Sequence, residues 1–222
     1  MSASASPPAI RVGVVDDHAI TRYALRRFIG SHDDLQVVEE GSSGREAIEI
    51  ARRQNAQVLL LDLEMPDRSG MDVLPMIRAK APDMGVVIHS SYSPAHYAVA
   101  AIRLGANGYV CKGGDLDELP AALRAAARGR RYLSPVVADL LASWAMDPSH
   151  VDPHAQPHER LTQREFQLML HFARGGESIA IADTLALSPK TVSTYHSLIL
   201  RKLGLRSNSH ITHYAMQHGL VD

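Results

Sequence analysis

Short runs of apolar residues recur along the first half of the chain, and each run stops at a polar side chain. The runs are residues 10–15, 58–61, 86–88 and 109–111. Mainly apolar runs of this length are typical of strands that are buried on both faces of a parallel sheet. The stretches between the runs have the apolar spacing of helices, as illustrated by Ile20, Ala24, Leu25, Phe28 and Ile29. Repeated strand–helix units predict a doubly wound α/β domain.

Two polar pairs predict where helices begin in this domain. Ser43 and Glu46 have the spacing of a capping box, and Asp115 and Glu118 have the same spacing ahead of an apolar stripe. A further short helix is expected over residues 134–143.

From residue 160 onward the apolar spacing is helical throughout. Thr162 and Glu165 predict a capping box for a first helix, and Gly175 is expected to end it. A short second helix follows. Ser188 is the expected N-cap of a third helix, because Pro189 suits the first helical position. A fourth helix is expected over about residues 209–217, which makes this part a small all-α domain.

These patterns divide the chain into four segments. Residues 147–158 contain three prolines and no apolar period, which is typical of a linker. The predicted segments are a disordered lead-in at 1–9, an α/β domain at 10–130, a connecting helix and linker at 131–159, and a helical domain at 160–222.

Charge is unevenly distributed, although the 222-residue chain has a formal net charge of only −1. Residues 160–222 carry 7 basic and 4 acidic side chains and five histidines. A mildly basic C-terminal domain permits nucleic-acid binding without proving it. No apolar stretch approaches the roughly 20 residues of a membrane span. The one cysteine excludes an internal disulfide, which fits a cytoplasmic protein.

The polar residues at the strand ends point to one chemical site. Ligands of open α/β sheets bind at the carboxyl ends of the strands, so the Asp16-Asp17 pair, Asp62, Ser90 and Lys112 should converge. Three carboxylates in one place require a cation to stay ionised, and oxygen ligands suit Mg²⁺. A lysine and a hydroxyl beside a metal-bound aspartate can hold a phosphoryl group on it. The alternative for the aspartate pair is a helix N-cap.

This part of the chain resembles the receiver domain of bacterial two-component response regulators. The segments that carry the resemblance are residues 14–18, 60–70, 89–92 and 105–112. It implies a flavodoxin-like fold with a five-stranded parallel sheet in the order 2-1-3-4-5. It also implies that Asp62 is the phosphoacceptor, that Lys112 and Ser90 bind the phosphoryl group, and that Tyr109 moves inward with Ser90 as a switch. The implied Mg²⁺ ligands are Asp17, Asp62, the backbone carbonyl of Glu64 and, through water, Asp16.

The helical domain resembles the LuxR-type helix-turn-helix of the NarL/FixJ subfamily of response regulators. The matching segments are residues 161–165, 181–185, 187–195 and 201–205. The resemblance makes the third helix the DNA-reading helix, and its outer face would supply the contacts, from Lys190, Ser193, Thr194, Ser197 and Arg201. Two positions depart from the common basic pattern, since His196 and Leu198 replace cations that could contact phosphate. A monomer should therefore bind DNA weakly, and dimerisation should matter more.

Together, the two resemblances imply a phosphorylation-dependent transcriptional regulator and not an enzyme. Its expected partners are a sensor histidine kinase, double-stranded promoter DNA, RNA polymerase and, once phosphorylated, a second copy of itself. The alternative is a regulator whose poorly basic helix binds a protein instead of DNA. Two other features suggest chemistry less strongly. Cys111 lies in an apolar run, where a cysteine is usually a small buried hydrophobe, and the histidines at 150, 154 and 158 lie among prolines without metal-site spacing.

Overall fold

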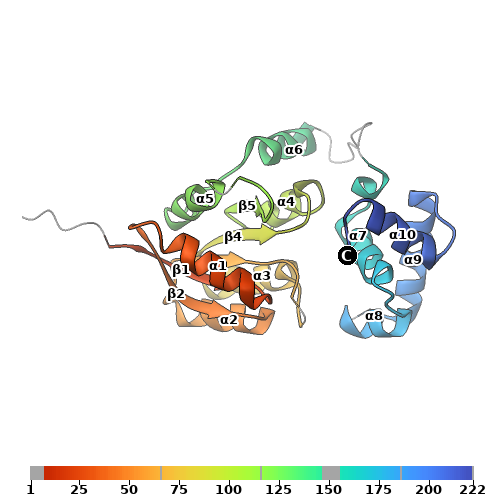
Figure 1. Cartoon of the computed structure of the whole chain (residues 1–222), viewed down its shortest axis with the longest axis horizontal. Helices are drawn as coiled ribbons and strands as arrows, with labels where there is room; N and C mark the ends of the chain where they lie inside the picture. Colours follow the sequence, from red (N-terminus) through yellow and green to blue (C-terminus); the bar gives the residue numbers. More distant parts are fainter. Residues whose placement is uncertain (1–7, 66, 116, 147–155, 186, 222) are drawn as a thin grey trace, which may run out of the picture. The chain divides into compact units, whose positions relative to one another are not determined.

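The computed structural model describes residues 8–65, 67–115, 117–146, 156–185 and 187–221. It contains two compact units, one built on a sheet and one made of helices (Figure 1). Along the chain, the sheet unit ends at Ala142 and the helical unit continues from Ser143. Within the described residues, no helix is both long enough and apolar enough to cross a membrane.

The sheet unit has the predicted flavodoxin-like topology. Five parallel strands lie in the order β2-β1-β3-β4-β5. The strands are β1 (Ile10–Val15), β2 (Leu35–Gly41), β3 (Val58–Leu61), β4 (Gly85–Ser90) and β5 (Gly108–Cys111). Four of them contain the apolar runs of the sequence. The fifth, β2, is an edge strand with three polar side chains, and its sequence therefore lacks a continuous apolar run.

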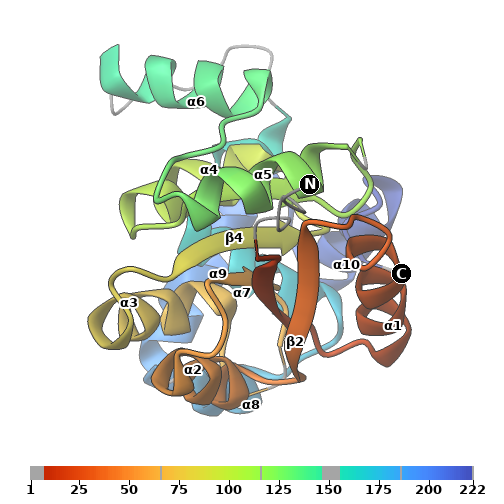
Figure 2. The same ribbon diagram turned by 90° about the vertical axis from the view of Figure 1, so that its left-hand side faces the viewer.

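Helices cover both faces of this sheet, and α1 and α3 lie on opposite sides of the strands (Figure 2). Their bounds are α1 (Ala19–Ile29), α2 (Gly44–Arg53), α3 (Gly70–Lys80), α4 (Pro94–Arg103) and α5 (Glu118–Ala127), and α6 (Pro135–Met146) follows them. Leu25 and Ile29 of the predicted apolar stripe of α1 are buried, but Ala24 is exposed and Ile20 is 85 % exposed, so the first part of the stripe does not turn inward.

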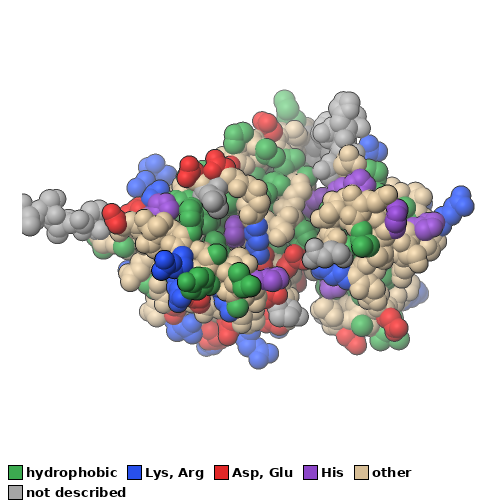
Figure 3. All heavy atoms as spheres, in the orientation of Figure 1, with side chains coloured by type: hydrophobic (Ala, Val, Ile, Leu, Met, Phe, Trp, Pro, Cys, Tyr) green, Lys and Arg blue, Asp and Glu red, His purple; other side chains and the backbone are tan. Residues whose placement is uncertain are grey.

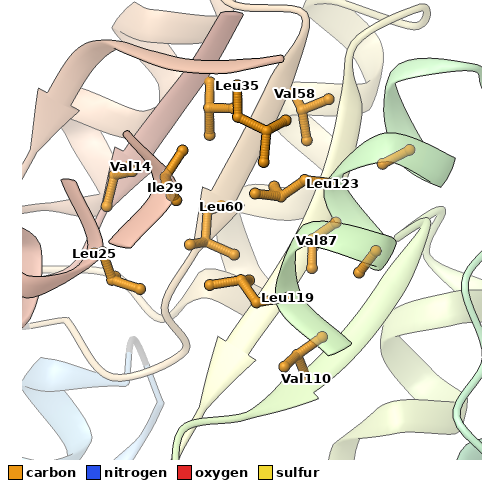
Figure 4. Close-up of a cluster of buried hydrophobic side chains, with 13 residues drawn as sticks. Val14, Leu25, Ile29, Leu35, Val58, Leu60, Val87, Val110, Leu119 and Leu123 are labelled. Atoms are coloured by element: carbon orange, nitrogen blue, oxygen red, sulfur yellow. The ribbon is translucent and has the colours of Figure 1, made fainter. Parts of the chain in front are cut away.

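One face of the sheet forms a hydrophobic core with α1 and α5. Figure 4 shows side chains from the central strands meeting Leu25 and Ile29 of α1 and Leu119 and Leu123 of α5. Leu60, near the centre of the cluster, is 1 % exposed. Burying an aliphatic side chain of this size contributes about 1.5–3 kcal/mol. This packing holds the ends of the strands, and hence the polar residues that follow them, in fixed relative positions.

Two helix starts in this unit differ from the predicted capping boxes. The Ser43 hydroxyl accepts a hydrogen bond from the Glu46 N–H at 3.2 Å, but the Glu46 carboxylate accepts from Ser42 instead of from Ser43. The predicted box of Asp115 and Glu118 is wrong. The Asp115 carboxylate accepts from the Asp117 N–H at 3.0 Å, and α5 begins at Glu118 without a side-chain cap. Local turn formation competes with capping for such short acidic side chains.

The helical unit contains a short 3₁₀ helix and four α-helices. Their bounds are η1 (Pro157–Arg160), α7 (Gln163–Ala173), α8 (Ser178–Thr184), α9 (Pro189–Leu203) and α10 (Asn208–Gln217). Both halves of the Thr162–Glu165 capping box are present, and the Ser188 hydroxyl caps α9. The 3₁₀ helix was not predicted, because it lies in the proline-containing segment that indicated a linker. Residues 147–155 of that segment lie outside the described residues.

Candidate functional site

Strand pairing brings the predicted polar residues to one edge of the sheet. Val15 pairs with Leu61 in register, so that Asp16 and Asp62 follow neighbouring strands side by side. The Asp62 N–H donates to the Val15 carbonyl at 2.9 Å and continues this ladder. On the other side, the Lys112 N–H donates to the Ser90 carbonyl at 2.9 Å.

A lysine ammonium bridges two buried carboxylates at this edge. Lys112 Nζ lies 2.7 Å from Asp62 Oδ2 and 2.7 Å from Asp16 Oδ2. Asp16 is 1 % exposed and Asp62 is 2 % exposed. Burial raises the pKa of Asp62 to about 6, even though Lys112 favours its charged form. Burial alone would lower the pKa of Lys112, but the two carboxylates outweigh it and raise that pKa.

The acidic residues also form a group that fits a divalent cation. One ligand atom from each of Asp16, Asp17, His18 and Asp62 lies within 4.8 Å of the others. Asp17 Oδ1 is buried and accepts no hydrogen bond from the described residues, whereas Asp16 Oδ2 is paired with Lys112. Carboxylate oxygens in this number suit Mg²⁺, which binds few carboxylates and keeps several waters. One oxygen has a local role, since Asp16 Oδ1 accepts the His18 N–H at 2.8 Å at the start of α1.

Ser90 and Tyr109 are placed as a coupled pair by the loop after β4. Ser90 is fully buried at the end of the strand, and its hydroxyl oxygen accepts the Tyr92 N–H at 3.1 Å. Tyr109 is 1 % exposed, so its ring already lies inward, and its hydroxyl donates to the Tyr92 carbonyl at 2.8 Å. The backbone of Tyr92 thus links both residues. Their role as a switch stays a prediction.

Two contacts around the site were not predicted. The Tyr92 hydroxyl donates to Glu64 Oε1, and it joins the loop after β4 to the loop after β3. Glu64 also donates its N–H to Asp62 Oδ1 at 3.2 Å, which orients the predicted phosphoacceptor. The contact between Tyr92 and Glu64 joins residues 28 apart in the chain, so no local spacing in the sequence signals it.

Asp67 ties the loop after β3 to the start of α2. Its carboxylate accepts the N–H groups of Gly44 at 2.8 Å, Arg45 at 3.0 Å and Arg68 at 2.8 Å. Burial opposes these hydrogen bonds, but they prevail and lower the pKa of Asp67. The same loop packs closely at its other end, because a Cβ on Gly70 would collide with the Asp62 carbonyl oxygen.

Two further side chains near the site are buried. His89 precedes Ser90 in β4 and is 8 % exposed. Burial, together with the positive charge of Lys112, lowers the pKa of His89 to about 4, so its ring is neutral at physiological pH. Cys111 is half-buried, and burial raises the pKa of its thiol. This environment agrees with the predicted role of Cys111 as a small packed side chain.

The outer face of α9 exposes all five residues predicted to contact DNA. They are Lys190, Ser193, Thr194, Ser197 and Arg201. The inner stripe of the helix is Val192, Tyr195, Ile199 and Leu203, as predicted, and Tyr195 is half-buried. The three hydroxyls on the outer face each donate to a carbonyl one turn earlier, as Thr194 does to Lys190 at 3.0 Å. Their oxygen lone pairs remain available to external donors.

His196, which was predicted to replace a cation that contacts phosphate, contacts neighbouring helices. Its ring centroid lies 4.6 Å from that of Phe172, and its Nε2 is 2.6 Å from Asn208 Oδ1. The side chain thus joins α9 to α7 and α10, and the effect of this position on DNA binding stays a prediction. On the face shown in Figure 3, acidic and basic side chains are interspersed over the sheet unit, and histidines recur on the helical unit.

Both units match models of known protein families. Residues 12–124 match the response regulator receiver domain, and residues 159–215 match the bacterial regulatory proteins of the luxR family.

The chain is also similar, over nearly its whole length, to two curated response regulators. The chain is 34 % identical over 213 residues to the response regulator GacA of Pseudomonas aeruginosa, covering 96 % of this chain and 98 % of that one. It is 30 % identical over 213 residues to the response regulator UvrY of Escherichia coli, covering 96 % of each. Among solved structures, RcsB from Salmonella enterica serovar Typhimurium bound to promoter P1flhDC, in the presence of the phosphomimetic BeF3⁻, matches with a TM-score of 0.70 and 26 % identity. That match covers 92 % of this chain and 97 % of RcsB.

Proposed function

Because the chain belongs to the LuxR-type response regulators, we propose that it accepts a phosphoryl group on Asp62 and that this modification controls binding of its C-terminal domain to promoter DNA. The observation that carries the proposal is the bridge from Lys112 to Asp62 and Asp16, 2.7 Å from each carboxylate. A buried aspartate beside a fixed cation at a sheet edge is the arrangement that a phosphoryl acceptor needs.

The transfer step uses the carboxylate of Asp62 as nucleophile. With a pKa of about 6, Asp62 is mostly ionised at neutral pH. One of its oxygens attacks the phosphorus of a phosphohistidine on the partner kinase. The new P–O bond forms as the P–N bond breaks, and the released imidazole takes up a proton. Lys112 pairs with the phosphoryl oxygens, and the Ser90 hydroxyl donates to one of them after it leaves the Tyr92 N–H.

Asp16, Asp17, Asp62 and the backbone carbonyl of Glu64 would hold Mg²⁺ at this site, with Asp16 acting through water. When bound, Mg²⁺ neutralises charge that develops on the transferring phosphoryl group. The buried Asp17 Oδ1, which accepts no hydrogen bond from the described residues, supports this ligand set.

The signal leaves the site through the Tyr92 backbone. If the Ser90 hydroxyl turns to the phosphoryl group, the Tyr92 N–H loses its acceptor, and the same residue carries the carbonyl that Tyr109 binds. A phosphoryl group therefore biases this loop between two hydrogen-bonding arrangements. The altered receiver surface would favour a homodimer, in which two helical units bind neighbouring half-sites.

The DNA contacts would come from the outer face of α9, from Lys190, Ser193, Thr194, Ser197 and Arg201, which are all exposed. Promoter-bound RcsB supports this assignment, since it aligns over 92 % of this chain. The regulator would act in the cytoplasm, where it would recruit or block RNA polymerase. Its own chemistry is limited to accepting the phosphoryl group and losing it slowly by hydrolysis, so we assign it no enzymatic turnover.

Phosphorylation is tested by intact-mass measurement after incubation with acetyl phosphate and Mg²⁺. The native chain should gain one phosphoryl group and Asp62→Asn none. Asp34→Asn is a matched control. It also removes a carboxylate, but Asp34 pairs with Arg124 and does not belong to the site. Equal labelling of the native chain and Asp62→Asn would disprove the assignment of the phosphoacceptor.

A further inference from the structure

We propose that His18 supplies a nitrogen ligand to the divalent site, so that the site also binds a borderline transition ion such as Zn²⁺ or Co²⁺. This inference rests on the proposed function only in placing a divalent cation among the aspartates. It adds a nitrogen ligand to the oxygen ligands proposed for Mg²⁺, and it adds transition ions to the metals that the site binds.

The His18 ring lies beside the oxygens that would hold the cation. Its Nδ1 is 2.6 Å from Asp17 Oδ1 and 3.5 Å from Asp16 Oδ1. A carboxylate oxygen of Asp62 completes a group of four ligand atoms, all within 4.8 Å of one another. Two ligands at metal–ligand distances of about 2.0–2.2 Å lie at most about 4.4 Å apart, so the widest separation in this group must shorten slightly when an ion binds.

The short distance from His18 to Asp17 is not a hydrogen bond. Asp17 Oδ1 is buried and accepts no hydrogen bond from the described residues, although Nδ1 is its close neighbour. Asp16 Oδ2, on a side chain that is 1 % exposed, is already paired with the Lys112 ammonium 2.7 Å away. Buried polar atoms normally have partners. A cation beside Asp17 Oδ1 would provide one.

The backbone of His18 is held at the start of α1, but its ring does not take part in capping the helix. His18 is the N-cap of α1, but its side chain makes no capping hydrogen bond. Its N–H is bound to Asp16 Oδ1 at 2.8 Å, and Arg22 donates to the Asp16 carbonyl at 2.7 Å. The side chain is 65 % exposed, so its reorientation toward an ion costs little desolvation.

An ordinary ion pair between His18 and Asp17 would contribute little, because one partner is exposed and surface pairs are worth about 0–1 kcal/mol. Ligation by the imidazole has a larger consequence, since nitrogen donors shift a site from Mg²⁺ toward Co²⁺, Ni²⁺ and Zn²⁺. Such an ion would hold an oxygen of Asp62 in its coordination sphere. Zn²⁺ would therefore compete with phosphorylation that depends on Mg²⁺.

Metal binding to the full-length protein tests this directly. Titration calorimetry with Co²⁺ and with Mg²⁺ would compare the native chain with His18→Ala and His18→Gln, and Co²⁺ absorption would report nitrogen ligation. Both variants should bind Co²⁺ about tenfold more weakly, which is a typical loss of affinity when a side chain at a metal site is changed. Both should keep the native affinity for Mg²⁺. His32→Ala, a change on the loop after α1, should change neither affinity. Added Zn²⁺ should suppress acetyl phosphate labelling of the native chain more than that of His18→Ala.

Asp17→Asn separates this inference from the proposed function. Asp17→Asn also identifies where Co²⁺ binds. Binding heat that is lost in this variant comes from this site and not from histidines elsewhere in the chain. If Asp17→Asn loses both metals while His18→Ala and His18→Gln bind Co²⁺ as the native chain does, the site is built from oxygen alone and the inference is wrong, but the proposed function stands. If Asp17→Asn binds Mg²⁺ and Co²⁺ as the native chain does, the aspartates hold no cation, and both the inference and the proposed metal site are overturned.

Discussion

Lys112 Nζ lies 2.7 Å from Asp62 Oδ2, and the same nitrogen lies 2.7 Å from Asp16 Oδ2. One ammonium thus compensates two buried carboxylates that follow different strands. The compensation is incomplete, because burial still raises the pKa of Asp62 to about 6. This imbalance makes the site favourable for a further cation and costly for the stability of the metal-free protein.

Asp62→Asn should therefore stabilise the metal-free protein at neutral pH. The pKa of Asp62 is raised from 3.8 to about 6 on folding. Protonated Asp62 therefore favours the folded state: its contribution to the free energy of unfolding is complete below pH 3.8 and is lost as the pH rises through 6. The difference between these two pKa values corresponds to roughly 3 kcal/mol in the free energy of unfolding. Urea unfolding in EDTA should show Asp62→Asn more stable than the native chain at pH 7.5, with a much smaller difference at pH 4.5.

The control for that measurement has the opposite sign. The hydrogen bond from Arg124 lowers the pKa of Asp34, so Asp34→Asn should lose stability at pH 7.5 and approach the native chain at low pH. Asp62→Asn that is less stable than the native chain at pH 7.5 would contradict the electrostatic description of the site.

Tyr92→Phe should shorten the lifetime of the phosphorylated form. The change keeps the ring and removes the hydrogen bond from the Tyr92 hydroxyl to Glu64, which joins the two loops beside Asp62. A hydrogen bond worth about 0.5–1.5 kcal/mol corresponds to roughly two- to tenfold in rate. Loss of the added phosphoryl mass, followed over time after removal of acetyl phosphate, measures the lifetime. Tyr23→Phe is the control, because the Tyr23 side chain of α1 is exposed. An unchanged lifetime in Tyr92→Phe would show that this hydrogen bond does not affect loss of the phosphoryl group.

Asp67→Ala should destabilise the sheet unit and weaken Mg²⁺ binding. Asp67 accepts three backbone N–H groups, two of them at the start of α2. Removing a cap of this kind costs about 1 kcal/mol, and it frees the loop that carries Glu64. Chemical unfolding and Mg²⁺ calorimetry check the two effects. Asp83→Ala, on the exposed loop after α3, should change neither quantity. Loss of stability with native Mg²⁺ affinity would restrict Asp67 to a structural role.

Thr194→Ala and Arg201→Ala should affect DNA binding in different ways. Thr194 lies near the start of α9, whose N-terminal residues would reach base edges, so its change should alter which promoter is preferred. Arg201, in the last turn, should contact only the backbone. Arg201→Ala should weaken all duplexes alike and reduce the salt slope by about one. Binding to a matched and a scrambled site across salt concentrations distinguishes them. Native binding by both variants would favour a protein partner for this helix.

Much of the fold follows from the sequence by itself. Four strands were predicted because most of their residues are buried, and strands buried on both faces of a sheet are mainly apolar. Their polar end residues also predicted the phosphoacceptor site, since parallel strands place their carboxyl ends at one edge. The capping box of α7 and the N-cap of α9 formed as expected, because these signals act within one helical turn.

Only the tertiary structure decided contacts between segments far apart in the chain. The carboxylate of Asp115 binds its own turn instead of capping α5, while Asp67 caps a helix 22 residues earlier. His196 faces Phe172 and Asn208 and not the outer face of α9. Spacing along the chain specifies the period of an element and its ends. Which side chains meet across elements, and therefore which charges are buried together, depends on packing that no local pattern encodes.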